Sequence, residues 1–390
     1  MSRTSKPKNL GHYKPDKILL YFTIFMAIFG AIMIFDASVY QANTVFEDQF
    51  YFLKQQIIWL LIGSIPAVVI YMWDYRKFSK LSLPALAFTI LLLIAVLILG
   101  EARNGAKRWL DVGIDIQPAE LAKVILIIYL SQWLAKREYS YKDFSSAIRE
   151  GFLKNLFGFI AILGSIALLI LLEPDLGTTI IICVTSFIMF LIAGEDRTHT
   201  LGSLTVVVLT LPLAALAAIL EPYRLKRVQT FLALVFTGDV ADPKGSGYQM
   251  QQILIGIGSG GILGKGFGQS RQRFGYLVEN TAFTDSIFAV VLEELGLIGG
   301  TVIILAWLLF LWRGIKVAIN APDKQGRLLA AGITVWLTLQ AFMNMAANVG
   351  LIPLTGIPTP FLTYGGSSTI VTLIGIAILL NVSKYSNNNA

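Results

Sequence analysis

The chain has 390 residues, of which 55% are hydrophobic and only 14% are charged. Soluble domains carry about a quarter charged residues, so this composition excludes an ordinary soluble protein and indicates an integral membrane protein. One cysteine, Cys183, excludes a disulfide framework, and two histidines exclude a His-based metal site. The net charge of +7 suits anionic lipid surfaces and gives no specific sign of nucleic acid.

Hydropathy predicts an all-α membrane fold of about ten spanning helices. The expected helices are 17–37, 51–73, 81–100, 118–135, 156–172, 176–193, 201–220, 286–312, 327–348 and 363–382. A large extracytoplasmic loop, 221–285, separates the seventh helix from the eighth. We therefore expect a tail at 1–16, one polytopic membrane domain at 17–384 and a second tail at 385–390.

The basic residues indicate how the chain is oriented. Those at 3–17, 76–80, 136–154 and 313–327 all fall on the side of the N-terminus. By the positive-inside rule, that side is cytoplasmic. We therefore expect a multi-pass protein of the cytoplasmic (inner) membrane with both termini in the cytoplasm. The basic N-terminal segment lacks a small-residue cleavage site and is interpreted as a tail, not a removed signal peptide.

Two outer loops carry cations that topology alone would discourage. The loop 101–117 contains "AKRWLD", with Lys107, Arg108 and Trp109, and the long loop contains Arg224, Arg227 and Lys265. One interpretation is that these groups bind an anionic ligand outside the membrane. The alternative is that long translocated loops escape the charge rule.

Three charged residues stand at the outer ends of apolar helices. Asp285 opens the helix expected at 286–312 and is either its N-cap or a working base. Glu120 and Lys123 lie three residues apart in "QPAELAK", on one helical face, and form either a structural ion pair or part of a polar site. We expect all three to share an outward-facing pocket.

Four further motifs lie on the same side. Asp175 in "LLEPDLGTT" is a candidate cap or ligand, and Arg224 and Arg227 in "YRLKR" suit phosphate oxygens or lipid headgroups. The glycine-rich segment 247–270, with Lys265 near its end, allows a re-entrant backbone to approach other helices or a ligand, and we expect close packing to explain most of its glycines. The segment 348–370 is broken by proline and glycine and offers the hydroxyls of Ser367 and Ser368, while Asn344 and Asn348 favour interhelical hydrogen bonds.

These motifs, with "TDSIFAVVLEELGLIG" and "LTGIPTPFLTYGGSS", resemble the SEDS family, which includes FtsW and RodA, over nearly the whole chain. "FLKQQIIW" and "GFGQSRQRFGYL" are more similar to FtsW, the division enzyme. The resemblance implies a peptidoglycan glycosyltransferase that polymerises lipid II at the outer leaflet, works with a single-span class B penicillin-binding protein and other division or elongation proteins, and binds no nucleic acid. Asp285, Glu120 and Lys123 match the family's functional positions, whereas Thr281, Phe283 and Gln56 depart from its usual Glu, His and Arg.

The expected chemistry follows from that resemblance. Asp285 accepts the proton of the acceptor sugar's 4-hydroxyl, and undecaprenyl pyrophosphate leaves from the growing glycan with inversion, its charge met by Lys123, Arg224 and Arg227. A divalent cation, Mg²⁺ or Mn²⁺, that bridges Asp285 and the pyrophosphate is a further alternative, although the sequence contains no compact ligand cluster that requires one. A flippase for lipid-linked precursors and a scaffold without catalysis are the rival hypotheses.

Overall fold

The structure is a computed structural model. It describes residues 14–103, 106–111, 113, 115–137, 152–194, 199–205, 222–240, 242, 247–274 and 278–386. Within them, nine helices are long and apolar enough to cross a membrane. They are α1 (Lys17–Phe46), α2 (Tyr51–Met72), α3 (Phe78–Leu99, extended by a 3₁₀ turn from Tyr75), α4 (Pro118–Ala135), α6 (Phe152–Leu172), α7 (Leu176–Ala193), α11 (Ile287–Ile319), α12 (Lys324–Asn348) and α13 (Gly366–Ser383).

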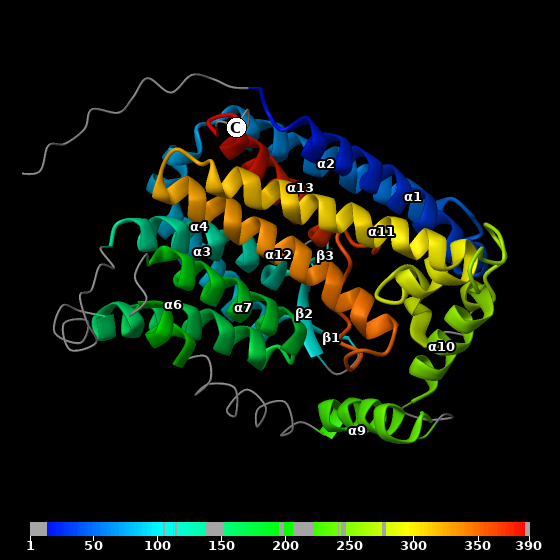
Figure 1. Cartoon of the computed structure of the whole chain (residues 1–390). Helices are drawn as coiled ribbons and strands as arrows, with labels where there is room; N and C mark the ends of the chain where they lie inside the picture. The colour runs from blue at the N-terminus through cyan, green and yellow to red at the C-terminus, as the bar shows by residue number, and fades with distance from the viewer. Residues whose placement is uncertain are drawn as a thin grey trace, which may run out of the picture.

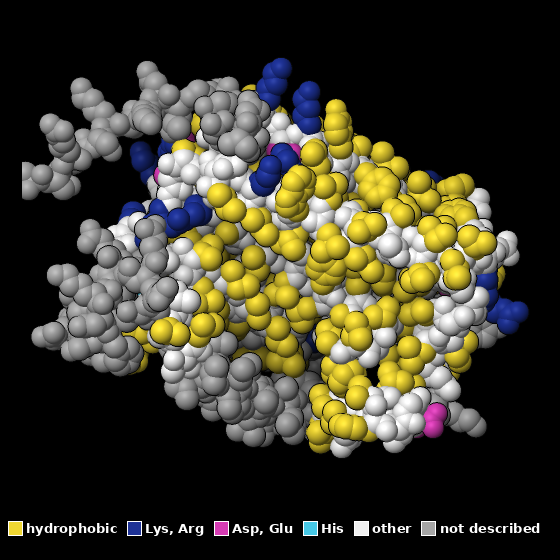
Figure 2. All heavy atoms as spheres, viewed as in Figure 1, with side chains coloured by type: hydrophobic (Ala, Val, Ile, Leu, Met, Phe, Trp, Pro, Cys, Tyr) yellow, Lys and Arg dark blue, Asp and Glu magenta, His cyan; other side chains and the backbone are white. Residues whose placement is uncertain are grey.

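The prediction of an all-α membrane fold is confirmed for nine of the ten expected helices. The remaining one, 201–220, falls mostly on residues outside the described ranges, and so do most of the tails at 1–16 and 385–390. Hydrophobic side chains cover the body of the face seen in Figure 2, and lysines and arginines gather at one side of it. That surface is what a helix bundle surrounded by lipid presents.

Helix α12 forms the centre of the bundle and packs against α11, α4, α7 and α13, while α13 lies along α2 (Figure 1). The start of α1 and the end of α13 meet, because the amide of Asp16 donates to the Ser383 hydroxyl at 3.1 Å. The Arg313 Nε of α11 donates to the Asp16 carboxylate at 2.9 Å. Both ends of the membrane domain therefore lie at one end of the bundle.

The loops at the opposite end, called here the Asp285 end, hold the remaining structure. Helices α9 (Pro222–Thr237) and α10 (Tyr248–Gly260) lie there, with short 3₁₀ helices at Gln272–Phe274 and Val278–Phe283. An antiparallel sheet of order β1-β2-β3 is built from Glu101–Arg103, Ala106–Asp111 and Asp115–Ile116. The hydropathy analysis did not predict this sheet, because such short, charged strands have neither a spanning length nor a regular apolar alternation.

The glycine-rich segment packs against α11, and several of its glycines lie in close contact with that helix, as expected. At Gly296 the backbone of α11 is left-handed, with φ of 64°, and the helical hydrogen bonds are interrupted. The amides of Leu297 and Ile298 donate instead to the carbonyls of Gly261 and Ile262, at 3.0 and 3.2 Å. A side chain at Gly264 would collide with the Glu294 carbonyl. This contact fixes α10 against α11 and so sets the position of the Asp285 end.

Candidate functional site

Asp285 lies in the turn immediately before α11 and is not its cap. The capping position is Ser286, and no side-chain hydrogen bond caps the helix there. The main-chain carbonyl of Asp285 accepts hydrogen bonds from Asn344 Nδ2 at 2.7 Å and Asn348 Nδ2 at 2.9 Å. The two asparagines thus make structural hydrogen bonds, as predicted, but to backbone carbonyls outside the helices and not to another helix, and α12 thereby holds the backbone of Asp285.

The side chain of Asp285 is half-buried beside a cation. A side chain at Gly356 would lie 3.9 Å from both Arg227 Nη1 and Asp285 Oδ2, so these two groups flank the same small space. Burial raises the pKa of Asp285, while the Thr284 hydroxyl, at 3.0 Å from Oδ1, and the charge of Arg227 act in the opposite direction. A carboxylate with a raised pKa is a stronger base than an exposed one.

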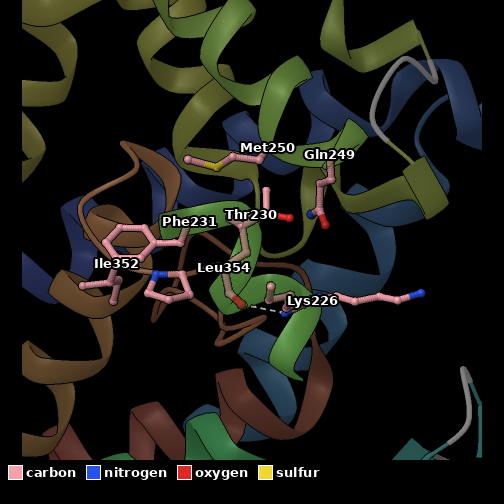
Figure 3. A pocket seen from close by; sticks show the side chains of 9 residues that line it. Lys226, Thr230, Phe231, Gln249, Met250, Ile352 and Leu354 are labelled. Carbon is pink, nitrogen blue, oxygen red and sulfur yellow. Dashed lines mark hydrogen bonds between the residues drawn. The ribbon is translucent and has the colours of Figure 1, made fainter. Parts of the chain in front are cut away.

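A cavity of about 110 Å³ opens beside Arg227, between α9, α10 and the segment 352–354. Figure 3 shows Gln249 and Thr230 pointing into it and Phe231, Met250 and Ile352 forming apolar walls. Arg227 Nη1 donates to the Leu354 carbonyl at 2.7 Å, drawn as a dashed line in Figure 3. The cavity combines cationic and apolar walls, which suits an anionic group attached to a hydrocarbon chain.

Glu120 and Lys123 form the predicted ion pair at 2.7 Å, but both side chains are only 1% exposed. Lys123 Nζ also donates to Gln340 Oε1 at 2.8 Å, and Gln340 donates to the Pro358 carbonyl at 2.9 Å. Lys123 lines a separate small cavity of about 10 Å³ toward α7. The pair is therefore connected to Asp285 through α12 and the segment 357–358. We had expected the pair to share a pocket with Asp285, but neither residue lines the larger cavity.

The turn between α6 and α7 uses its acids differently. Asp175 caps α7, accepting from the Thr178 amide at 3.0 Å and the Thr178 hydroxyl at 2.9 Å, so the capping alternative holds and the ligand role expected for Asp175 has no support. Glu173 is completely buried, and neither carboxylate oxygen has a hydrogen-bond partner among the described residues. Burial, then the charge of Asp175, raises the pKa of Glu173 to about 8.

The other residues expected to bind substrate lie in different environments. Arg108 binds the turn, donating to the Glu173 carbonyl at 3.1 Å, and half-buried Trp109 follows it in β2. Lys265 pairs with Glu293 at 2.7 Å. Lys107 is exposed, while Ser367 and Ser368 are half-buried, and Ser367 accepts from the Gln117 amide at 3.1 Å. The side chain of Arg224 lies outside the described part of the structure.

Residues that sequence reasoning missed also surround Asp285. Gln249 of α10 donates to Thr281 and Ser286, and the Thr363 hydroxyl donates to the Thr284 carbonyl at 2.9 Å. One signal could have found Gln340: with Asn344 and Asn348 it forms a stripe of amides four residues apart on an otherwise apolar helix. No group of three or more His, Cys, Asp or Glu side chains gathers within the described ranges.

Comparison with known proteins places this geometry among cell-wall proteins. Residues 16–388 match a family model covering FtsW, RodA and SpoVE, described as "Cell cycle protein". Stage V sporulation protein E of Bacillus subtilis is 39% identical, over 95% of this chain and 98% of the relative. A probable peptidoglycan glycosyltransferase FtsW of Geobacter metallireducens is 38% identical, over 94% of each chain.

A solved structure agrees in fold. It belongs to work described as "Structural coordination of polymerization and crosslinking by a peptidoglycan synthase complex". The matching chain has a TM-score of 0.75 and 25% sequence identity, over 95% of this chain and 97% of that one. The described helices thus follow a known arrangement from α1 to α13.

Proposed function

This chain belongs to the FtsW, RodA and SpoVE family of cell cycle proteins, and from this membership we propose that it is a peptidoglycan glycosyltransferase that polymerises lipid II during cell division. The Asp285 end then faces the outside of the cytoplasmic membrane, and both termini lie in the cytoplasm. The joined ends of α1 and α13 support that orientation, because they share one end of the bundle with the lysine- and arginine-rich loops.

One observation carries the proposal: a half-buried carboxylate that caps no helix lies beside an arginine and a cavity with cationic and apolar walls. A structural Asp at a helix start would be expected to cap it. The Asp285 backbone is instead held by two asparagines, and its side chain flanks the space at Gly356 together with Arg227. That arrangement suits a general base more than a structural group.

In the proposed reaction, the Asp285 carboxylate accepts the proton of the 4-hydroxyl on the acceptor sugar. The freed oxygen forms a bond to the anomeric carbon of the growing glycan, and the bond from that carbon to the pyrophosphate oxygen breaks with inversion. The undecaprenyl pyrophosphate that leaves gains one negative charge, and Asp285 later returns its proton to water. Well-placed base catalysis contributes about 10²–10⁴-fold.

The leaving group needs a positive environment, and Arg227 supplies it at the cavity wall, with Arg224 one helical turn earlier on α9. In this scheme the buried Glu120–Lys123 pair does not contact the reacting groups and acts indirectly, through Gln340. It holds Gln340, which fixes the segment carrying Pro358 next to Asn344 and the Asp285 backbone. No step is assigned to a divalent cation.

A membrane-anchored transpeptidase of the penicillin-binding class is the proposed partner. It would cross-link the glycan that this chain polymerises, as the description of the related synthase complex suggests for that assembly. The partner is included in the test because polymerisation by the isolated chain is expected to be weaker.

The test is polymerisation of labelled lipid II by the purified chain with its partner transpeptidase. Asp285→Asn removes the base with little change in size, and the rate should fall by about 10²-fold or more. Asp239→Asn, an exposed acid in the same loop, is the matched control and should polymerise at the wild-type rate.

Two outcomes would argue against the proposal. Polymer formation that persists in Asp285→Asn removes this residue from the mechanism. Absence of polymer with folded wild-type protein and partner favours the flippase hypothesis, which a lipid II translocation assay in vesicles would then test.

A further inference from the structure

Thr363 lies in the irregular segment between α12 and α13, and its side chain is buried. We propose that Thr363 is a positioning residue of the reaction, which holds Thr284 and thereby sets the place of the Asp285 carboxylate. This inference rests on the proposed function, because it assumes that Asp285 acts as the base. The sequence predicted an irregular segment there and gave Thr363 no role of its own.

The hydroxyl of Thr363 joins its own segment to the turn that carries Asp285. It donates to the Thr284 carbonyl at 2.9 Å and accepts from the Thr359 amide at 2.8 Å. A hydroxyl has one donor and two acceptor lone pairs, so both bonds form at once. The amide of Tyr364 donates to the Phe283 carbonyl at 3.0 Å, which adds a main-chain bond beside the side-chain bond.

Three consecutive carbonyls of this turn are therefore bonded by groups from other segments. The carbonyls of residues 283, 284 and 285 accept, in that order, from the Tyr364 amide, the Thr363 hydroxyl and the two asparagines of α12. They precede the N-cap of α11, Ser286, so they lie outside the hydrogen bonds of that helix. The position of the turn is thus set by these outside donors.

Thr284 carries the constraint from this backbone to the reacting side chain. Its carbonyl accepts from Thr363, and its hydroxyl donates to Asp285 Oδ1 at 3.0 Å. The other carboxylate oxygen, Oδ2, flanks the space at Gly356 that Arg227 also flanks. A shift of Thr284 therefore moves the donor to Oδ1 together with the peptide that leads to Asp285. Thr363 acts on the carboxylate through Thr284 and does not touch it.

Helix α12 supports the segment that carries Thr363. Asn344 Nδ2 donates to the Ile357 carbonyl at 2.8 Å, and Gln340 Nε2 donates to the Pro358 carbonyl at 2.9 Å. Asn344 also donates to the Asp285 carbonyl at 2.7 Å. The two segments that Thr363 joins therefore share one support, and Thr363 adds the contact on the N-terminal side of Asp285.

The backbone next to Thr363 is strained and closely confined. Phe361 is buried and has a φ of 68°, in the left-handed region that costs free energy for any residue except glycine. The Thr363 amide donates to the Thr359 carbonyl at 3.0 Å and closes the turn around Phe361. On its other side, a side chain at Gly30 of α1 would collide with the Phe361 carbonyl. Such a conformation persists only where the surroundings determine it, and this confinement gives Thr363 a fixed place.

The experiment measures kcat and KM for lipid II polymerisation by the full chain with its partner, below the thermal midpoint of every variant. Thr363→Val keeps the shape of the side chain and removes the hydroxyl. We expect kcat to fall by roughly ten- to a hundredfold with little change in KM, because a misplacement of about 1 Å can cost 10²-fold. Thr363→Ser keeps the hydroxyl and should restore most of the rate.

A second substitution tests whether Thr363 acts through Thr284. Thr284→Val removes the hydroxyl that contacts Asp285 and keeps the carbonyl that Thr363 bonds. In this background Thr363→Val should reduce kcat by only about threefold or less, because the contact that it positions is already lost. A general loss of structure would reduce the rate by the same factor in both backgrounds. If Thr363→Val does not fold, Thr363→Ala replaces it, since alanine also lacks the hydroxyl and is smaller.

Thr372→Val is the matched control, because Thr372 is a buried threonine of α13 whose hydroxyl has no hydrogen-bond partner among the described residues. It should polymerise at the wild-type rate. The inference is overturned if the Thr363 variants without a hydroxyl keep the wild-type kcat, if Thr363→Ser is equally slow, or if the two backgrounds give equal factors.

Asp285→Asn separates this inference from the proposed function. If Asp285→Asn polymerises normally, the proposed function fails, whatever the Thr363 variants do. If Asp285→Asn is inactive while Thr363→Val is normal, the proposed function stands and the positioning role of Thr363 is wrong.

Discussion

Two pairs in this molecule each place a carboxylate near a cation, yet they are built in opposite ways: Glu120 with Lys123, and Asp285 with Arg227. The first is closed: its charges touch at 2.7 Å, both side chains are 1% exposed, and a glutamine takes a further N–H of the lysine. The second is open: Asp285 is half-buried, Arg227 bonds the Leu354 carbonyl, and these two groups, both within the described residues, flank the small space at Gly356 with no ion pair between them. A closed pair holds helices together, whereas Arg227 of the open pair also lines a cavity that a ligand could enter.

Breaking the closed pair should have the largest effect on stability. Lys123→Met leaves Glu120 buried without its counterion, and removal of one partner from a buried pair costs about 3–5 kcal/mol. We expect a marked fall in the thermal midpoint of the purified protein in detergent. The double variant Glu120→Gln with Lys123→Met should recover part of the loss, because no uncompensated charge stays buried.

Asp285→Asn is the control on the open side and should melt near the wild-type temperature. If Lys123→Met instead melts normally and loses only polymerisation, the pair belongs to the reacting groups and the distinction between closed and open pairs is wrong.

Removing the cation of the open pair should reduce activity with little change in stability. Arg227→Met takes away the charge that we propose meets the leaving group, and loss of one such electrostatic contact costs about 10²-fold in rate. The acid limb of the pH profile should also move upward, because a nearby cation lowers the pKa of Asp285 and its removal raises it. The measurement is the polymerisation rate from pH 5 to 9.

Lys154→Met is the matched control, since this exposed lysine on α6 carries the same charge and does not line the cavity. A net-charge effect would slow both variants alike. An effect of position would slow Arg227→Met alone, and Arg227→Lys should then restore part of the rate.

The sequence predicted those parts of the molecule that depend on local patterns. Spanning helices follow from runs of apolar residues, the close packing of the glycine-rich segment from its glycines, and the irregular segment before α13 from its prolines and glycines. Asp285 and Arg227 were expected at the same end because topology alone assigns residues to an end. These patterns are visible in a few neighbouring residues, so no knowledge of packing was needed.

What the sequence could not predict depends on contacts between distant segments. Gln249 is 37 residues before Ser286 and bonds its hydroxyl only because α10 folds back onto α11. Whether Lys123 faces a substrate or Gln340 depends on the rotation of α12, and the spacing of Glu120 and Lys123 is the same in either case. The capping role of Asp175 is different, because Thr178 is only three residues away and the local sequence already offered capping as one of two alternatives.

Glu173 offers the smallest and most specific test of the comparison, since it is buried like Glu120 but its carboxylate has no partner among the described residues. Its pKa is raised from 4.5 to about 8 in the folded chain, so between these values the unfolded state releases a proton that the folded state keeps. The contribution of Glu173 to stability therefore falls as the pH rises from about 4.5 to 8. Glu173→Gln removes this titration and should match the wild type at pH 5.

At pH 8, Glu173→Gln should melt higher than the wild type by on the order of a few degrees. The measurement is the difference in thermal midpoint between variant and wild type across this pH range, with Asp239→Asn as the control for loss of an exposed acid. A difference that does not grow with pH would mean that Glu173 is ionised in the folded chain, and the nearby Arg108 would then be its counterion. In that case Glu173 and Arg108 would form a second closed pair in the α6–α7 turn. Glu173 would then resemble Glu120, because both would be buried carboxylates with a counterion.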